Sequence, residues 1–316
     1  MPDKSNNAQR DPGRSREAYT SQDMLKAIKL LEYLHKGGQK KPDELAKFFT
    51  DAGFRDNTSE KVSRILEALT KSSLPVRSAD GHLYWADLFD DQAVGRRKYQ
   101  YRVSKENMAK KVVELLISQS PVVRSIFLGA GTSVLFVTHE LIRRIDDLKS
   151  LYCVYTNNFL AMSELVRHRL QIPIHVPEGE IRLQDGAIIS DEGIDSLNRK
   201  SFDAVVTGFY GLSFDDGFSS DHQYDRQEKL MNLRPANCSK IYIVLNWEKI
   251  GTAYQVVATV QEGIDENKEY FIVTDPPKGW HTSPDHTHKL QEIRKWGGLV
   301  DRHIVHFIYV ERPVSP

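Results

Sequence analysis

The spacing of apolar residues along the chain predicts two parts with different architectures. Within the first hundred residues, three stretches repeat apolar side chains at helical intervals. The most regular stretch places Val62, Ile65, Leu66 and Leu69 on one face of a helix. We expect Asn57 to cap this helix, with Glu60 three residues on completing a capping box. From about residue 105 onward, helical stretches instead alternate with short apolar runs that are typical of strands.

A hairpin signal follows the third predicted helix. Asp80–Gly81 is a dipeptide that favours a two-residue turn, and strand-forming residues flank it on both sides. Three helices followed by a hairpin predict a winged helix-turn-helix, in which the third helix enters the major groove of DNA. The predicted DNA-contacting residues are Asn57, Thr58, Ser59, Lys61, Ser63, Arg64, Arg77 and His82. A small helical domain that binds protein remains an alternative.

The domain boundaries follow from this division. Residues 1–20 have the polar composition of a disordered leader, and residues 21–89 hold the winged helix-turn-helix. Residues 90–104 form a linker, and residues 105–316 form an α/β domain. Strands separated by helices of ten or more residues predict a Rossmann-like, mostly parallel sheet, which binds ligands at the carboxyl ends of its strands.

Small and polar residues collect at those predicted strand ends. Gly129, Gly131, Thr132 and Ser133 follow the first strand of the α/β domain. A dinucleotide fingerprint needs a third glycine where this chain has Val134, and no Gly-Lys-Ser/Thr sequence of a P-loop is present here. The remaining possibilities are an anion site at a helix N-terminus or a turn that needs glycine for its geometry.

Composition narrows the class of protein. The chain of 316 residues has 40% hydrophobic residues and no net charge, and no run of about 18 apolar residues that could cross a membrane. The N-terminus lacks the apolar core of a signal peptide, so we expect a cytoplasmic protein. Its two cysteines are far apart and are expected to be reduced thiols. Basic residues are in excess in the first third of the chain and acidic residues in the rest, which favours a polyanion partner for the first part.

The order of these segments resembles that of DeoR-type transcriptional regulators. The resemblance rests on the predicted winged helix, then "FLGAGTS", "YTNN", "FDAVVTGFYGLSFDDGFSS" and "LNWEKIG". It implies a sugar-phosphate-binding sensor domain that is similar in fold to ribose-5-phosphate isomerase. The residues to which it assigns ligand binding, together with those at the predicted strand ends, are Gly129, Gly131, Thr132, Ser133, Thr156, Asn157, Asn158, Asp185, Gly186, Gly208 and Lys249.

The predicted function is therefore a DNA-binding regulator, expected to be a repressor, that senses a phosphorylated metabolite such as a sugar phosphate or a nucleotide. It is expected to bind double-stranded DNA as a homodimer or higher homo-oligomer, without cofactor, metal or membrane. Two alternatives remain: a sugar-phosphate isomerase and a protein-interaction scaffold with a vestigial pocket. The isomerase would need a carboxylate base, with candidates at Asp185, Asp203, Asp215 and Asp216.

A histidine-rich segment near the C-terminus is the one candidate for a metal. His281, His286 and His288 stand among proline and serine residues, which are typical of an exposed loop. Their spacing gives no ordered set of ligands, so an exposed loop is the favoured interpretation and the metal site stays open.

Overall fold

The computed structural model describes residues 26, 30, 44–54, 57–58, 61–63, 65, 76–79, 82–85, 97, 100–119, 122–182, 185–220 and 225–310. The chain divides into two compact units, Met1–Leu88 and Phe89–Pro316, and each is described by itself. Among the described residues, no helix has the length and apolar character needed to cross a membrane.

The N-terminal unit contains parts of the predicted helices and the predicted hairpin. Helix α2 spans Leu45–Asp51 and buries Leu45 and Phe49. Strand β1 (Val76–Ala79) pairs antiparallel with β2 (His82–Trp85) so that Ala79 lies opposite His82, which confirms the hairpin pairing. Ser59 and Arg64, the side chains of Arg77 and His82, and residues 1–20 lie outside what the structure describes.

The cap of the third helix differs from the prediction. Thr58 caps it, because its Oγ1 accepts a hydrogen bond from the Lys61 N–H at 3.4 Å. The Asn57 side chain instead donates to Thr50 Oγ1 and to the carbonyl of Phe54, each at 3.0 Å. Asparagine and threonine are both strong N-cap residues, so two adjacent candidates could not be separated by type alone.

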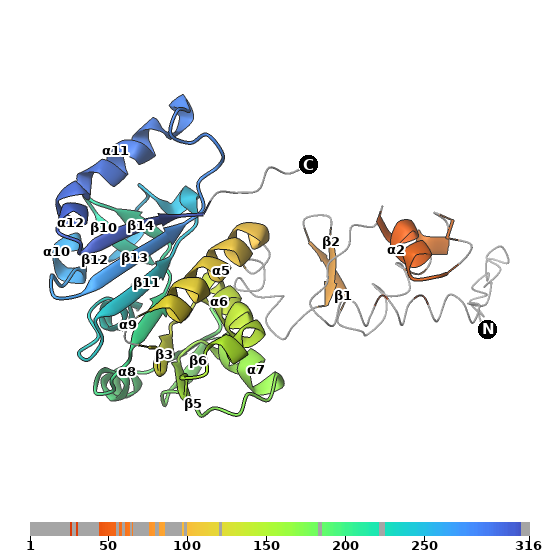
Figure 1. Cartoon of the computed structure of the whole chain (residues 1–316), viewed down its shortest axis with the longest axis horizontal. Helices are drawn as coiled ribbons and strands as arrows, with labels where there is room; N and C mark the ends of the chain where they lie inside the picture. Colours follow the sequence, from red (N-terminus) through yellow and green to blue (C-terminus); the bar gives the residue numbers. More distant parts are fainter. Residues whose placement is uncertain are drawn as a thin grey trace, which may run out of the picture. The chain divides into compact units, whose positions relative to one another are not determined.

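The C-terminal unit is built on a seven-stranded, wholly parallel sheet, which confirms the predicted mostly parallel α/β architecture (Figure 1). Its strands lie in the order β14-β13-β11-β8-β3-β4-β5. Their bounds are β3 (Ser125–Leu128), β4 (Cys153–Thr156), β5 (Ile174–His175), β8 (Ala204–Thr207), β11 (Lys240–Val244), β13 (Glu269–Thr274) and β14 (Val305–Tyr309).

Both faces of this sheet are buried under helices. Along β3, Ile126 and Leu128 face one apolar cluster, and Phe127 faces the other. The first cluster packs against α5 (Arg102–Ser118), α6 (Thr132–Arg143) and α7 (Phe159–Arg167). The second packs against α8 (Asp191–Asn198), α9 (Arg226–Leu233), α11 (Thr287–Lys295) and the residues around α12 (Gly297–Asp301). Burial on both faces explains the continuous apolar runs of the strands.

The strand order reverses between β3 and β8. From β3 the chain continues outward through β4 and β5, and then returns to β8 on the other side and continues through β11, β13 and β14. Loops that leave the two neighbouring strands therefore go to opposite faces of the sheet and leave a crevice at their carboxyl ends. This switch point is where an open α/β sheet is expected to bind a ligand.

Two smaller sheets were not predicted from the sequence. Strands β9 (Gly211–Ser213), β10 (Gly217–Ser220) and β12 (Gln255–Ala258) form an antiparallel sheet, and β6 (Glu180–Arg182) pairs with β7 (Ala187–Ile189). Asp215 and Asp216 lie in the turn between β9 and β10. The remaining elements are α10 (Val260–Gly263) and the 3-10 turns η2 (Ile145–Asp147), η4 (Trp247–Lys249) and η5 (Pro284–His286).

Candidate functional site

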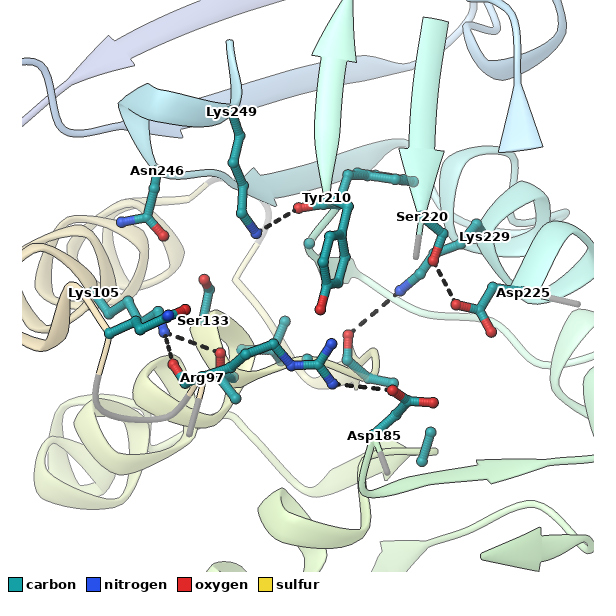
Figure 2. Close-up of a pocket in the computed structure, with 18 of the residues that line it drawn as sticks. Arg97, Lys105, Ser133, Asp185, Tyr210, Ser220, Asp225, Lys229, Asn246 and Lys249 are labelled. Carbon is teal, nitrogen blue, oxygen red and sulfur yellow. Dashed lines mark hydrogen bonds and ion pairs between the residues drawn. The ribbon is translucent and has the colours of Figure 1, made fainter. Parts of the chain in front are cut away.

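A cavity of about 140 Å³ opens at the switch point of the sheet. Its walls come from the loop after β3, the loop after β8, the turn after β11, the segment that leads into α5, the β6–β7 hairpin and the start of α9. Figure 2 shows polar and charged side chains from these elements converging on one space. The cationic residues that line it are Arg97, Lys105, Arg182, Lys229 and Lys249, and the acidic ones are Asp185, Asp225 and Glu228. The excess of positive charge favours an anionic ligand.

The glycine loop supplies one wall through the N-terminus of α6. Gly131 is the N-cap residue with a φ of 131°, a conformation that favours glycine, and no side chain caps the helix. Thr132 and Ser133 form the first turn and line the cavity. The first amide groups of a helix have no partner within it and carry partial positive charge, so they suit an anion.

Residues after β4 support this loop from behind. The Asn158 side chain donates to the carbonyls of Gly129 (3.2 Å) and Gly131 (3.1 Å), and it also caps α7 by accepting from the Ala161 N–H. The Thr156 hydroxyl donates to the Leu128 carbonyl at 2.7 Å. These side chains fix the shape of the glycine loop.

Lys105 reaches the loop from α5. Its Nζ donates to Thr132 Oγ1 at 3.1 Å and to the carbonyl of Arg97. Burial, together with the positive charges of Lys249 and Arg97, lowers the pKa of Lys105 to about 7. A lysine in this state gains a proton more readily when an anion binds beside it. Lys105 is therefore a titratable group that lies beside the first turn of α6.

The turn after β11 adds Asn246 and Lys249. Lys249 Nζ donates to the carbonyl of Phe209 at 2.9 Å and lies 4.9 Å from the centroid of the Tyr210 ring. Asn246 lines the cavity and is only 1% exposed, and its amide nitrogen has no partner within the described part of the chain. A buried donor without a partner costs about 1–3 kcal/mol, so a ligand oxygen that accepts from it would recover that loss.

The opposite side of the cavity holds a network of paired charges. Arg97 Nη2 lies 3.0 Å from Asp185 Oδ1, and its guanidinium carbon lies 5.2 Å from the Tyr210 ring centroid. Arg182 forms ion pairs with both Asp185 and Asp225, and Asp225 also accepts from the Ser220 hydroxyl. Positive and negative groups alternate here, which suits the hydroxyl groups of a ligand better than a second anionic group.

Six of the eleven ligand-binding residues predicted from the sequence line this cavity: Gly131, Thr132, Ser133, Asp185, Gly208 and Lys249. The other five lie outside its lining: Gly129, Thr156, Asn157, Asn158 and Gly186. Gly129 lies where a Cβ atom would be 3.0 Å from the Asn232 amide nitrogen, and Gly186 takes a φ of 63° in the turn between β6 and β7. Asn157 is buried and its carbonyl accepts from the Ile188 N–H at 2.7 Å.

Several lining residues were not predicted from the sequence. Lys105 is a buried charge on a helix, and its sequence context is that of an ordinary solvated face. Arg97 was assigned to the linker, and Arg182 and Lys229 belong to segments where no strand end was expected. Asn246 carried a usable signal, because it ends a predicted strand three residues before Lys249.

The carboxylates proposed for the isomerase alternative are scattered. Asp185 lines the cavity, but Asp203 accepts hydrogen bonds from the Arg124 and Ser125 amides before β3. Asp215 pairs with Lys295, and Asp216 accepts from the Ser213 hydroxyl at 3.0 Å.

His281 and His288 of the histidine-rich segment are exposed, as predicted, but the segment is not a loop throughout. It contains η5 and the start of α11, and Trp280 within it is buried. His286 Nδ1 accepts from the Trp247 indole N–H at 3.4 Å, and His281 packs on Trp280. Over the described ranges, no three His, Cys, Asp or Glu side chains are grouped so that they could hold a metal ion.

Comparison with known proteins identifies the family. A model of the DeoR C-terminal sensor domain matches residues 101–292. The chain belongs to this family. Its resemblance to DeoR-type regulators is thereby confirmed, and the match begins one residue before α5 and includes most of α11.

Repressors from two bacteria are similar to this chain in sequence. The chain is 22% identical over 222 residues to the glycerol-3-phosphate regulon repressor of Escherichia coli K12. The matched region covers 70% of this chain and 81% of that protein. The repressor of the same name from Shigella flexneri gives the same values.

Among solved structures, ribose 5-phosphate isomerase A from Methanocaldococcus jannaschii matches with 16% identity and a TM-score of 0.33, over 49% of this chain and 56% of that one. The enzyme from Plasmodium falciparum matches with 16% identity and a TM-score of 0.32, over 48% of this chain and 52% of that one. The chain thus spans about half the length of these isomerases.

Proposed function

We propose that this DeoR-family protein is a transcriptional repressor whose C-terminal unit binds a phosphorylated metabolite, with a sugar phosphate or glycerol 3-phosphate as the first candidates. The observation that carries the proposal is the convergence of Lys105, Lys249 and the α6 N-terminus on one cavity. The names of the E. coli and Shigella relatives support the choice of ligand class and the direction of regulation.

The phosphoryl group would bind at the α6 end of the cavity. Its oxygens can accept hydrogen bonds there from the main-chain amides of Thr132 and Ser133, the two lysine ammonium groups and the Asn246 amide. The hydroxyl-bearing part of the ligand would face Asp185 and Arg97, whose paired charges offer both acceptors and donors. A nucleotide is a less favourable candidate, because about 140 Å³ leaves little room for a base.

The N-terminal unit would bind double-stranded DNA through a winged helix-turn-helix, as predicted from the sequence. The hairpin β1–β2 and the helical residues Lys61, Val62 and Ser63 are consistent with that module. A homodimer or higher oligomer would present two such modules to a two-fold symmetric operator. Sensing rather than catalysis is favoured, because three of the four carboxylates proposed for an isomerase are engaged away from the cavity.

The ligand would act through the joining segment, the part of the chain between Leu88 and the start of α5 at Arg102. Arg97 lies nine residues after the end of the N-terminal unit, and both its side chain and its carbonyl take part in the cavity wall. A bound phosphate would compete for Lys105, which now donates to that carbonyl. Ligand binding would thereby change the stability of one arrangement of the joining segment relative to others.

The proposal is tested by selecting DNA that the full chain binds and then measuring the Kd for that DNA with and without candidate ligands. We expect a phosphorylated compound to change the Kd at least tenfold, whereas its unphosphorylated counterpart leaves the Kd unchanged. If the chain binds no DNA, that result would favour the protein-interaction scaffold instead. Conversion of a sugar phosphate would favour the isomerase.

A further inference from the structure

Lys289 on α11 is a buried lysine that lies outside the cavity but directly behind one of its walls. Its Nζ donates to the carbonyl of Glu248 at 3.0 Å and to the carbonyl of Ile250 at 2.7 Å. These two residues stand immediately before and after Lys249. One ammonium group therefore fixes the main chain on both sides of the cavity-lining lysine.

The turn that carries Lys249 has other fixed points, which leave its orientation well defined. The Trp247 N–H donates to Asp275 Oδ1 at 3.0 Å, and the Gly251 N–H donates to the Leu212 carbonyl at 2.7 Å. Gly251 has a φ of 72°, so the chain turns sharply directly after the carbonyl of Ile250. Between these ends, Lys289 donates to the carbonyls of Glu248 and Ile250.

Helix α11 is anchored to the domain by further contacts besides those of Lys289. Its Leu290 and Ile293 pack against the apolar cluster on that face of the sheet. Glu292 on the same helix accepts from the Phe214 N–H at the tip of the β9–β10 hairpin and pairs with Lys295 at 3.2 Å. The helix can therefore act as a rigid support for the turn.

The ammonium group of Lys289 is buried and is directed at two main-chain carbonyls. Lys289 is 8% exposed, and burial lowers its pKa, which reflects the cost of keeping an ammonium out of water. Replacement of Lys289 alone by an apolar residue would leave the carbonyls of Glu248 and Ile250 without this donor. The directional bonds of lysine to two carbonyls offer what an apolar side chain cannot, namely control over where the turn lies.

We propose that Lys289 is a positioning residue of the effector site, which holds the turn Trp247–Ile250 so that Lys249 points into the cavity. This inference rests on the proposed function of that cavity. It also gives a role to the C-terminal segment with its histidines, whose part in the protein the sequence did not explain. Lys289 acts through Lys249 and does not itself line the cavity.

The test is a double-mutant cycle with inorganic phosphate as the probe. Binding is measured by calorimetry at millimolar phosphate for the full chain and for Lys249→Met, Lys289→Met and the double variant. We expect Lys249→Met to weaken phosphate binding about 10-fold to 100-fold, because it removes one charged donor. Lys289→Met should weaken phosphate binding about tenfold, because it displaces that donor. The double variant should bind no more weakly than Lys249→Met, because Lys289 acts only through that residue.

Two further variants serve as controls. Arg294→Met removes an exposed charge from the same helix and should bind phosphate as the unmodified chain does. Lys289→Arg keeps donors for both carbonyls and should restore part of the affinity. Additive losses in the cycle, or a Lys289→Met variant with unchanged affinity, would overturn the inference.

Hydrogen exchange separates this inference from the proposed function. The amides of Lys249, Ile250 and Gly251 are hydrogen-bonded in the turn, so Lys289→Met should speed their exchange, while Arg294→Met should not. A full chain that binds no phosphate overturns the anion site, and the exchange rates then decide the positioning role alone. Unchanged exchange in Lys289→Met would contradict it.

Discussion

Lys105 Nζ on α5 donates to Thr132 Oγ1 on the first turn of α6, over 3.1 Å. This hydrogen bond joins the helix that follows the inter-unit segment to the helix whose N-terminus faces the cavity. The same ammonium donates to the carbonyl of Arg97, within that segment. The buried ammonium group of Lys105 therefore connects the first turn of α6 to the main chain at Arg97.

The stability of the ligand-free protein should rise with pH above neutrality because of Lys105. Its pKa is lowered from 10.5 to about 7, so between these values the unfolded chain holds a proton that the folded chain has lost. From pH 6.5 to 8.5 this linkage should add on the order of 2 kcal/mol to the free energy of unfolding. Urea unfolding at the two pH values measures it, and Lys105→Met should lack this part of the rise. Equal pH dependence in both proteins would contradict the assignment.

Ligand binding should have the opposite pH dependence. A bound phosphate favours the charged form of Lys105 and raises its pKa, so binding above pH 7 should take up a proton. Affinity should therefore fall as the pH rises from 7 to 9. Calorimetry in buffers of different ionisation enthalpy measures the proton uptake. Lys105→Arg, which stays charged throughout, should show neither the uptake nor the fall.

Arg97 should couple the cavity to DNA binding. Arg97→Ala removes the ion pair with Asp185 and the contact with Tyr210, both of which tie the joining segment to the cavity wall. We expect this variant to bind DNA and to bind ligand within about tenfold of the unmodified chain, but to release DNA far less in response to the ligand. Fluorescence anisotropy with labelled DNA measures all three properties, and a normal ligand response would place the coupling elsewhere.

The third helix of the N-terminal unit should carry the DNA contacts. Replacement of Lys61 and Arg64 by alanine should weaken DNA binding about tenfold or more and reduce its salt dependence, since each phosphate contact releases counterions. Gel shifts at two salt concentrations measure both effects. Thermal stabilisation by the ligand should be unaffected, and unchanged DNA binding would remove the assignment of this helix.

The sheet and the glycine loop could be predicted from the sequence because local patterns determine them. The apolar runs around Ile126, Val205 and Ile243 are continuous, as strands buried on both faces require, and α6, a helix of 12 residues, separates β3 from β4. The carboxyl ends of neighbouring parallel strands share one edge, so Gly131 and Lys249 could be placed together.

The rest of the site depends on contacts that no local pattern encodes. Lys105 and Thr132 are 27 positions apart, and Arg97 and Asp185 are 88 apart, and each pair meets only through the packing of the domain. Strands β9 and β10 were missed because glycine at Gly211 and Gly217 resembles a loop in sequence. At Gly211 a Cβ atom would lie 2.3 Å from the Thr252 carbonyl. The close packing of these two segments therefore requires glycine there.

The most direct test of the account is the thermal stabilisation of the full chain by matched pairs of ligands. Glycerol 3-phosphate and a panel of sugar phosphates are compared with glycerol and the free sugars. We predict that at least one phosphorylated compound raises the Tm while its unphosphorylated partner does not, and that Thr132→Val and Lys249→Met abolish the shift. Stabilisation that persists in both variants, or that is equal for a phosphorylated compound and its partner, would contradict a phosphate site at the α6 N-terminus.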